Sequence, residues 1–262
     1  MPGARRFRRG IYLLPTLFTV GNLFCGFSSL VQSARGEYEH AAALIIVAGI
    51  LDLLDGRIAR LTGTTSEFGV EFDSLADVVS FGLAPAFLAY HWALEPLHRL
   101  GWLVAFLFVV CAAMRLARFN IQSSGGSKRY FAGLPTPPAA ASLACLAFAF
   151  PEPPGVAWAS SGVAVLVVFV ALLMVSRFRY RSFKDVDLGN RRSYLYVLLV
   201  AAAIVAIAYK PAGASVVLAG AYVVSGPVSY IWTLVRKPSG RTTPTSAARA
   251  REPEVADEPV GR

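Results

Sequence analysis

Charged residues are scarce in this sequence. Only 16% of its 262 residues are Asp, Glu, Lys or Arg, whereas soluble domains carry roughly 25%. Apolar residues make up 55% of the chain, and its mean hydropathy is +0.54. A water-exposed surface cannot be covered with so few charges. The composition therefore excludes an ordinary soluble protein and predicts an integral membrane protein that crosses the bilayer several times.

Cysteine is also scarce, and its placement argues against two kinds of site. Cys25, Cys111 and Cys145 all lie inside apolar stretches. None of them shows the CxxC or Cys/His spacing that is typical of zinc sites. We therefore expect neither a disulfide framework nor a thiolate metal centre.

Basic residues outnumber acidic ones, at 25 against 16, which gives a formal net charge of +9. In a soluble chain this excess would suggest nucleic-acid binding. Here the basic residues lie between apolar runs, where they set membrane topology and meet anionic lipid headgroups. We therefore expect membrane lipid as a partner, and no nucleic acid.

Eight apolar segments approach or reach the length of a membrane-spanning helix, which is about 20 residues. They are roughly 11–34, 38–61, 72–94, 97–119, 134–150, 155–176, 193–209 and 212–235. A helix pairs its own backbone N–H and C=O groups, whereas an open sheet would leave such groups unpaired in hydrocarbon. The sequence therefore predicts an all-α, polytopic bundle of about eight transmembrane helices.

The Lys and Arg residues predict how this bundle is oriented. If the N-terminus is cytoplasmic, 22 of the 25 lie in cytoplasmic tails and loops, leaving only Arg35, Arg99 and Lys210 outside. Positive charges favour the cytoplasmic side of a membrane. We therefore predict that both termini are cytoplasmic and that the protein lies in the cell inner (cytoplasmic) membrane. Residues 1–10 would be a basic tail, and residues 237–262, rich in Pro, Ser, Thr, Arg and Glu, a disordered one.

Acidic residues concentrate in one short stretch. Six of the sixteen lie between residues 52 and 77, at the predicted cytoplasmic ends of the second and third segments. Asp52 and Asp55 are three residues apart and share one face of a helix. Asp73 and Asp77 are four apart and share a face of the next. A tight connection through residues 63–66 makes these helices antiparallel neighbours, so we expect the four carboxylates to converge.

Converging carboxylates at membrane level need compensation. Ionisable groups in a membrane are costly and usually functional, and four carboxylates would repel one another. Oxygen ligands without His or Cys select a hard cation such as Mg²⁺ or Mn²⁺. Two such ions would balance the charges and suit phosphoryl transfer. Gly56 lets a ligand approach the helix backbone, and Arg60 is spaced to meet a phosphate. Glu67 and Glu71 are interpreted as solvated helix-end charges.

Every fixed position of a known signature is present in this stretch. The pattern reads Asp52-x2-Asp55-Gly56-x2-Ala59-Arg60-x8-Gly69-x3-Asp73-x3-Asp77. It resembles the CDP-alcohol phosphotransferase family, and this resemblance implies a two-metal site, a CDP-linked donor, an alcohol acceptor and a homodimer. It also implies the roles of individual residues. Metal would be held by Asp52, Asp55, Asp73 and Asp77, with Asp77 also the general base, and the donor would be contacted by Gly56, Arg60, Ser66 and Thr19.

Four further stretches resemble the phosphatidylserine synthase branch of that family. They are LFTVGNLFCGF at 17–27, EFGVEFDSLADVVSFGLAPA at 67–86, RLARFN at 115–120 and FAGLPTPPAAA at 131–141. The resemblance implies CDP-diacylglycerol as donor, L-serine as acceptor and CMP as product, by direct displacement at the cytoplasmic face. Residues 11–141 would be the catalytic helices and 142–236 additional transmembrane helices. The predicted acceptor contacts are Arg115, Arg118, Asn120 and Pro135.

Other interpretations stay open at this stage. Arg115 and Arg118 each have an ordinary alternative role as anchors at the membrane interface. The nearest rival function uses the same chemistry with choline, glycerol 3-phosphate or inositol phosphate as acceptor. A rival from another class is an ion-coupled transporter that uses the aspartates as a relay. Transport would need carboxylates near the bilayer centre and paired broken helices, whereas these aspartates lie at one pair of helix ends.

Overall fold

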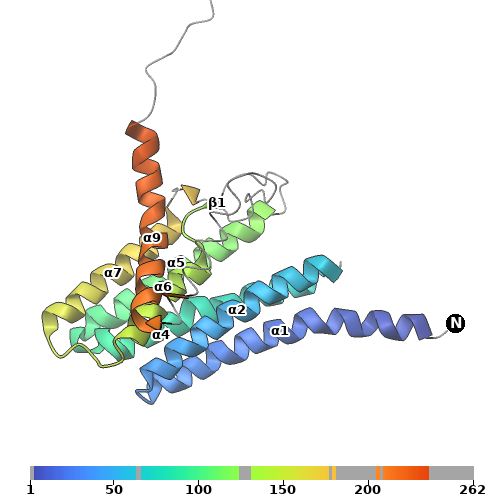
Figure 1. Cartoon of the computed structure of the whole chain (residues 1–262), viewed down its shortest axis with the longest axis horizontal. Helices are drawn as coiled ribbons and strands as arrows, with labels where there is room; N and C mark the ends of the chain where they lie inside the picture. The colour runs from blue at the N-terminus through green and yellow to red at the C-terminus, as the bar shows by residue number, and fades with distance from the viewer. Residues whose placement is uncertain are drawn as a thin grey trace, which may run out of the picture.

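The chain forms a bundle of long helices, shown in Figure 1. The computed structural model describes residues 3–62, 66–123, 131–176, 179–180, 205–206 and 209–235, with the side chains of 3–15, 59–60, 62, 122–123, 131–132, 179–180 and 230–235 left out. The long helices are α1 (Gly3–Ala34), α2 (Tyr38–Thr62), α5 (Arg99–Ser123), α6 (Thr136–Ala149), α7 (Ala157–Val175) and α9 (Pro211–Val235).

One further span is built from five consecutive helical elements. It consists of α3 (Glu67–Asp77), the π-helical η1 (Val78–Leu83), α4 (Ala84–Ala89), the π-helical η2 (Tyr90–Leu94) and the 3₁₀ turn η3 (Glu95–Leu97). Proline near the start of α4 has no N–H to donate to the preceding turn, so the hydrogen-bond register changes there. The first π segment starts directly after the last predicted metal ligand.

Helix α1 packs along α2 and also contacts α3 and η1 (Figure 1). The buried face of α1 is made of small or polar residues at helical spacing, namely Thr19, Asn22, Cys25, Gly26, Ser29 and Ser33. Small residues let helix backbones approach closely in a membrane protein, where lipid offers no hydrophobic force between helices. The contact between α1 and α2 is therefore close and partly polar.

Two clusters of buried residues form the core, and small residues dominate one of them. One cluster joins α1, α2, α4 and α6 through Ala42, Ala48, Ala84, Ala140 and Ala144. The other joins α5, α6 and α7 around larger side chains, including Phe108, Leu143 and Val170. Helix α9 packs against α6 and crosses the other helices steeply in Figure 1. The core therefore runs through the middle of the bundle, and the aspartate-bearing ends of α2 and α3 lie at its edge.

The segments predicted from the sequence coincide in position with helices over the part of the chain that the structure describes. The segment 38–61 is α2, and the segment 212–235 is α9. The first helix is longer than expected, because it starts at Gly3 and continues through the basic residues. Five helices or helix runs are long and apolar enough to cross a membrane, and α6 is a shorter apolar helix. Eight spans and cytoplasmic termini stay predictions.

Two details lie outside the all-helical expectation or beyond the described residues. Two-residue strands, β1 (Phe131–Ala132) and β2 (Arg179–Tyr180), pair antiparallel between the connections that follow α5 and α7. The seventh predicted segment, 193–209, lies largely outside the described residues, as does the whole predicted tail 237–262.

Candidate active site

Three of the four predicted metal ligands converge. Carboxylate oxygens of Asp52, Asp73 and Asp77 lie within 4.8 Å of one another, and each of these residues is half-buried. Asp52 comes from α2, and the other two come from consecutive turns of α3. The spacing argument is therefore confirmed for these three residues. The four-residue step within α3 brings one pair to a face, and α2 supplies the third carboxylate.

The fourth predicted ligand, Asp55, is held by α1. It is only 6% exposed, and Thr19 Oγ1 of α1 donates a hydrogen bond to its Oδ2. Asp55 remains near enough to Asp52 and Asp73 for their charges to interact. Thr19 is itself buried, at 4% exposed, and its hydroxyl is bonded to a carboxylate of the cluster. Its predicted contact with the donor stays a prediction.

A second residue of α1 reaches the cluster from the same face. Asn22 is completely buried, and its Nδ2 donates a hydrogen bond to Asp77 Oδ1 at 3.3 Å. Its backbone carbonyl accepts a hydrogen bond from Ser80 Oγ at 3.0 Å. Asn22 was not among the site residues predicted from the sequence. The signal that could have found it is a polar residue three positions after Thr19, on one face of an otherwise apolar helix.

The contact between α1 and the π segment η1 fixes these distances. Gly26 lies directly against Ser80, and a Cβ atom at position 26 would collide with its backbone and hydroxyl. Glycine is therefore required here for close approach rather than for an unusual backbone angle. Because Asn22 lies one turn before Gly26, this approach carries its amide to Asp77. The polar face of α1 is a third wall of the site, beside α2 and α3.

The residues fit a hard divalent cation. All the groups that converge are oxygen donors, which is the ligand chemistry of Mg²⁺ and Mn²⁺. Asp73 Oδ1 is buried and has no hydrogen-bond partner within the described residues. A buried charged oxygen without a partner is costly, so a cation at this point would satisfy it. The structure therefore supports a metal centre at this cluster without identifying the ion.

The predicted donor contacts differ in what the structure says of them. Ser66 is the N-cap of α3, and its Oγ accepts a hydrogen bond from the Gly69 N–H at 3.0 Å. Ser66 therefore has a structural role at the start of the helix that carries two ligands. Gly56 lies exposed on α2, one residue after Asp55. Arg60 lies in the last turn of α2, and its side chain is outside the part that the structure describes.

The predicted acceptor residue Arg115 is held in place from α6. Its Nη1 donates a hydrogen bond to Thr136 Oγ1 at 2.5 Å, and its guanidinium carbon lies 5.9 Å from the centre of the Phe119 ring. The charges of Arg115 and Asp77 are close enough to interact, and Tyr222 of α9 also interacts with Arg115. An arginine fixed on two sides presents its fork in one orientation. Thr136 and Tyr222 were not among the residues predicted from the sequence.

The motif FAGLPTPP at residues 131–138 has a structural role at the start of α6. Gly133 has φ +91 and lies so close to the Met174 carbonyl that no side chain fits there. The Leu134 N–H donates to the Leu173 carbonyl at 3.0 Å, which ties the segment to the end of α7. Pro135 is the N-cap of α6, and the completely buried Thr136 follows it. The motif therefore starts α6 where Thr136 meets the guanidinium of the preceding helix.

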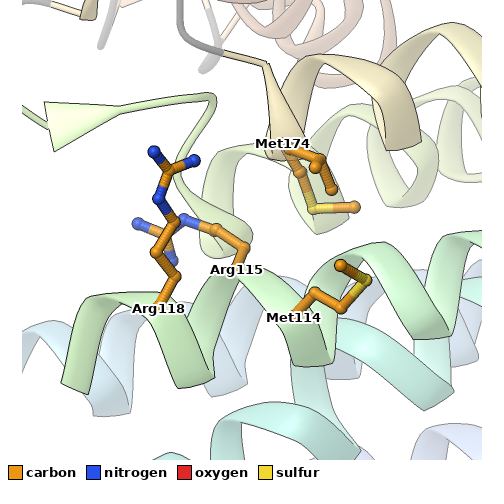
Figure 2. A pocket seen from close by; sticks show the side chains of 5 residues that line it. Met114, Arg115, Arg118 and Met174 are labelled. Carbon is orange, nitrogen blue, oxygen red and sulfur yellow. The ribbon is translucent and has the colours of Figure 1, made fainter. Parts of the chain in front are cut away.

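Arg118 lies in a different environment. It is exposed, and it lines a cavity of about 430 Å³ together with Met114, Arg115, Met174 and Val175. Figure 2 shows the two arginines extending to one side of this cavity and the two methionines lining the other. None of the four aspartates lines the cavity. The two arginines therefore differ, because Arg115 is half-buried, bonded to Thr136 and close enough to Asp77 for their charges to interact, whereas Arg118 is exposed.

Asn120, another predicted acceptor contact, pairs with α3. Its Nδ2 donates to Ser74 Oγ at 2.9 Å, and Ser74 Oγ in turn bonds the Val70 carbonyl at 3.0 Å. Ser74 follows Asp73 directly, so this pair ties the end of α5 to the helix that carries the ligands. The observed contact is thus a structural tie beside the cluster. A contact of Asn120 with the acceptor stays a prediction.

Comparison with known proteins gives a family and several relatives. Residues 12–176 match the model of the CDP-alcohol phosphatidyltransferase family. The CDP-diacylglycerol–serine O-phosphatidyltransferase of Helicobacter pylori is 37% identical over 228 residues, which cover 86% of this chain and 94% of the relative. The enzyme of that name from Bacillus subtilis is 37% identical over 69% of this chain and 96% of its own length. An archaetidylserine synthase of Methanothermobacter thermautotrophicus is 36% identical over 64% of this chain and 69% of its own length.

Proposed function

The chain belongs to the CDP-alcohol phosphatidyltransferase family, and we propose that it transfers the phosphatidyl group of CDP-diacylglycerol to L-serine with release of CMP. The observation that carries the proposal is the match over most of the chain with relatives named CDP-diacylglycerol–serine O-phosphatidyltransferase, beside the complete aspartate signature in this sequence. The three converging carboxylates support phosphoryl-transfer chemistry at this place. The interacting charges of Arg115 and Asp77 support an acceptor that carries its own carboxylate.

The proposed reaction is a direct displacement at phosphorus. Asp77 takes the proton from the serine hydroxyl, whose oxygen then bonds to the phosphatidyl phosphorus of the donor. The bond from that phosphorus to the bridging oxygen of the diphosphate breaks, and CMP leaves with the electron pair. Asn22 holds Oδ1 of Asp77, which orients the other carboxylate oxygen. Arg60 and Gly56 would meet the diphosphate, and Arg115 would bind the carboxylate of serine.

The metal belongs to this proposal as Mg²⁺ or Mn²⁺, in two sites. Asp52, Asp73 and Asp77 would hold it, with Asp55 completing the set from its Thr19-bonded position. Bound there, a divalent cation supplies positive charge that offsets the negative charge of the diphosphate and the leaving CMP. The carboxylates of the chain contribute by fixing where that charge lies.

We further propose that the site lies at the cytoplasmic face of the inner membrane and that the protein is a homodimer with eight spans. The distribution of Lys and Arg supports the orientation, and the family resemblance supports the dimer. Residues 11–141 would supply the catalytic helices and 142–236 the additional ones. Tags at residues 36 and 153 should then be reached only from outside, and tags at 126 and 186 only from the cytoplasm. A tag at 126 that reports the outer side would overturn the orientation.

The substrate proposal is tested by an acceptor panel. Purified protein receives CDP-diacylglycerol and Mn²⁺ or Mg²⁺, and CMP release is measured with serine, choline, glycerol 3-phosphate and inositol phosphate. We expect the fastest release with serine. If glycerol 3-phosphate or inositol phosphate is used while serine is inert, the acceptor is wrong, although the aspartate chemistry survives. Asp73→Ala serves as the inactive control, and Glu71→Ala, an exposed carboxylate of the same helix, as the matched active one.

A further inference from the structure

The side chain of Asn22 has one bonded end and one unbonded end. Its Nδ2 donates to Asp77 Oδ1, whereas its Oδ1 is buried and has no hydrogen-bond partner among the described residues. The residue is 0% exposed, so its amide oxygen lies in the interior of the site rather than on the outer surface of the protein. Buried amide oxygens are almost always paired, and each exception needs an explanation. Here the unpaired oxygen belongs to the same amide group that holds the proposed base.

The position of this amide is imposed by its surroundings. The backbone carbonyl of Asn22 accepts from Ser80 Oγ at 3.0 Å, and Gly26, one turn later, lies against Ser80. These contacts fix α1 against η1, immediately after Asp77 in the chain. The amide nitrogen faces a carboxylate oxygen of Asp77. An ionised carboxylate accepts hydrogen bonds and donates none. The orientation with nitrogen toward Asp77 is therefore the one that forms a bond, and the oxygen remains available.

A second buried oxygen on the same face of α1 is a useful contrast. Ser33 Oγ is also buried and unpartnered within the described residues. A serine hydroxyl in a helix can rotate toward the carbonyl of an earlier turn and pair with it. The amide of Asn22 has no such choice, because its nitrogen is already bonded. In addition, Ser33 lies near the C-terminal end of α1, about three turns away from Asn22.

The ligand of Asn22 Oδ1 must be a hydrogen-bond donor that arrives beside Asp77. The proposed acceptor, serine, carries its hydroxyl and its ammonium group on adjacent carbon atoms. When the hydroxyl is at Asp77, the ammonium group is within reach of a side chain bonded to Asp77. Choline has no N–H, and glycerol 3-phosphate and inositol phosphate have no ammonium group. An amide oxygen at this point therefore favours an amino-alcohol over each of the rival acceptors.

We propose that Asn22 is a specificity residue, whose Oδ1 accepts a hydrogen bond from the ammonium group of the acceptor while its Nδ2 orients Asp77. This inference rests on the proposed function and deepens it. The hydroxyl of serine then meets Asp77, its ammonium group meets Asn22, and its carboxylate meets Arg115. Recognition of the acceptor is thus shared between α1, α3 and α5, and a molecule that lacks one of the three groups is used less well.

The test compares two acceptors in three proteins. The acceptors are L-serine and 3-hydroxypropionate, which has the hydroxyl and the carboxylate but no ammonium group. The proteins are the wild type, Asn22→Ala and Ser33→Ala, each full-length, in detergent with CDP-diacylglycerol and saturating Mn²⁺. We expect Asn22→Ala to raise KM for serine by roughly 10- to 100-fold, the usual effect of losing a hydrogen bond to a charged group. The preference for serine over 3-hydroxypropionate should fall by a similar factor, and Ser33→Ala should keep both values.

A second variant separates recognition from orientation. Asn22→Asp keeps an acceptor oxygen for the ammonium group but loses the amide donor to Asp77. We expect its KM for serine to stay within about threefold of the wild-type value and its kcat to fall at least tenfold. This split keeps the test decisive if Asn22→Ala does not fold, because a purely structural role for Asn22 would change both constants together.

One result would overturn the inference, namely that Asn22→Ala keeps the wild-type preference for serine over 3-hydroxypropionate. If the Mn²⁺ concentration for half-maximal activity also rises more than tenfold in that variant, Oδ1 is a metal ligand instead. Failure of the proposed function is distinguishable from both outcomes, since the wild-type protein would then release no CMP with serine.

Discussion

Acidic side chains lie in opposite environments at the two ends of α2. At one end, Asp52, Asp73 and Asp77 lie together, and Asp55 is 6% exposed. At the other end, where α1 passes into α2, Glu37 and His40 form a contact at 3.3 Å, with their side chains 59% and 70% exposed. There each of the two side chains has a neighbour and is exposed to solvent. At the aspartate end, a buried carboxylate oxygen of Asp73 has no partner within the described residues.

This difference shows why position, rather than residue type, identifies the site. Exposed ion pairs contribute little to stability, about 0–1 kcal/mol, and their loss is tolerated. Buried like charges without compensation are costly, and a protein retains them where a ligand or a reaction needs them. The first prediction breaks this comparison by removing a carboxylate at each end, and the second sharpens it within the aspartate cluster.

The largest effect is expected from removing a metal ligand. Asp73→Ala deletes the carboxylate that has an unpartnered buried oxygen, so metal and donor binding should both weaken. Loss of outer residues around a metal typically costs about 10–100-fold in activity, and loss of a direct ligand should exceed that. The measurement is the steady-state rate of CMP release. Glu37→Ala, at the other end, is the control, and we expect it to stay within about twofold of wild type.

A similar loss of activity in Glu37→Ala would contradict the comparison, because it would mean that any acidic residue at a helix end matters. Folding is checked by gel filtration in detergent for both variants. An Asp73→Ala protein that elutes like wild type and releases no CMP would confirm that the carboxylate acts in the reaction rather than in the fold.

The second prediction separates the base from the ligands within the cluster. Asp77→Asn keeps the shape of the side chain but cannot take a proton. We expect CDP-diacylglycerol affinity to stay largely intact, and single-turnover CMP release to fall by about 10²–10⁴-fold. Donor affinity and the single-turnover rate are measured at saturating Mn²⁺. Near-normal turnover in Asp77→Asn would show that Asp77 is not the base. The matched control is Glu71→Gln, on the exposed face of α3.

Local features of the sequence predict the helices well. The run 38–61 became Tyr38–Thr62, because the length of an apolar stretch and its flanking polar residues are visible without the fold. The convergence of Asp52, Asp73 and Asp77 was predictable for the same reason, since helical spacing and a short connection determine it. Features that depend on distances of a few residues along the chain are available from sequence alone.

Contacts between distant segments were not predictable in this way. Asn22 lies 55 residues from Asp77, and Thr19 lies 36 residues from Asp55. Their meeting depends on how closely α1 packs against its neighbours, which the Gly26 contact with Ser80 decides. The link from Arg115 to Thr136 likewise depends on where α6 begins. Packing of this kind has no local signature beyond a face of small and polar residues.

The third prediction uses stability rather than activity. If the aspartates hold a divalent cation, Mn²⁺ should raise the thermal unfolding midpoint of the wild-type protein without any substrate. At a concentration 100 times the dissociation constant, the stabilisation is about 2.7 kcal/mol. Chelation should reverse it. The same titration on Asp73→Ala should give a much smaller shift, whereas Glu37→Ala should respond like wild type. Equal shifts in all three proteins would place the binding of Mn²⁺ elsewhere.

The smallest effect is expected at Ser66, whose role is divided between two interpretations. As the N-cap of α3 it accepts from the Gly69 N–H at 3.0 Å. Loss of such a cap costs about 0.5–2 kcal/mol when alanine replaces it, but only a few tenths when glycine does. If Ser66 instead contacts CDP-diacylglycerol, the alanine and glycine variants lose that hydroxyl equally.

Comparing Ser66→Ala with Ser66→Gly therefore separates the two roles. If the hydroxyl only caps the helix, the alanine variant should be less stable than the glycine variant, and KM for CDP-diacylglycerol should be unchanged in both. If it also meets the diphosphate, KM should rise in both by the same factor, whatever their stability. The measurements are the thermal midpoint and KM for the donor. We expect the rise in KM, because Ser66 starts the helix that carries Asp73 and Asp77 and lies on its exposed side. An unchanged KM in both variants would leave Ser66 as a cap alone.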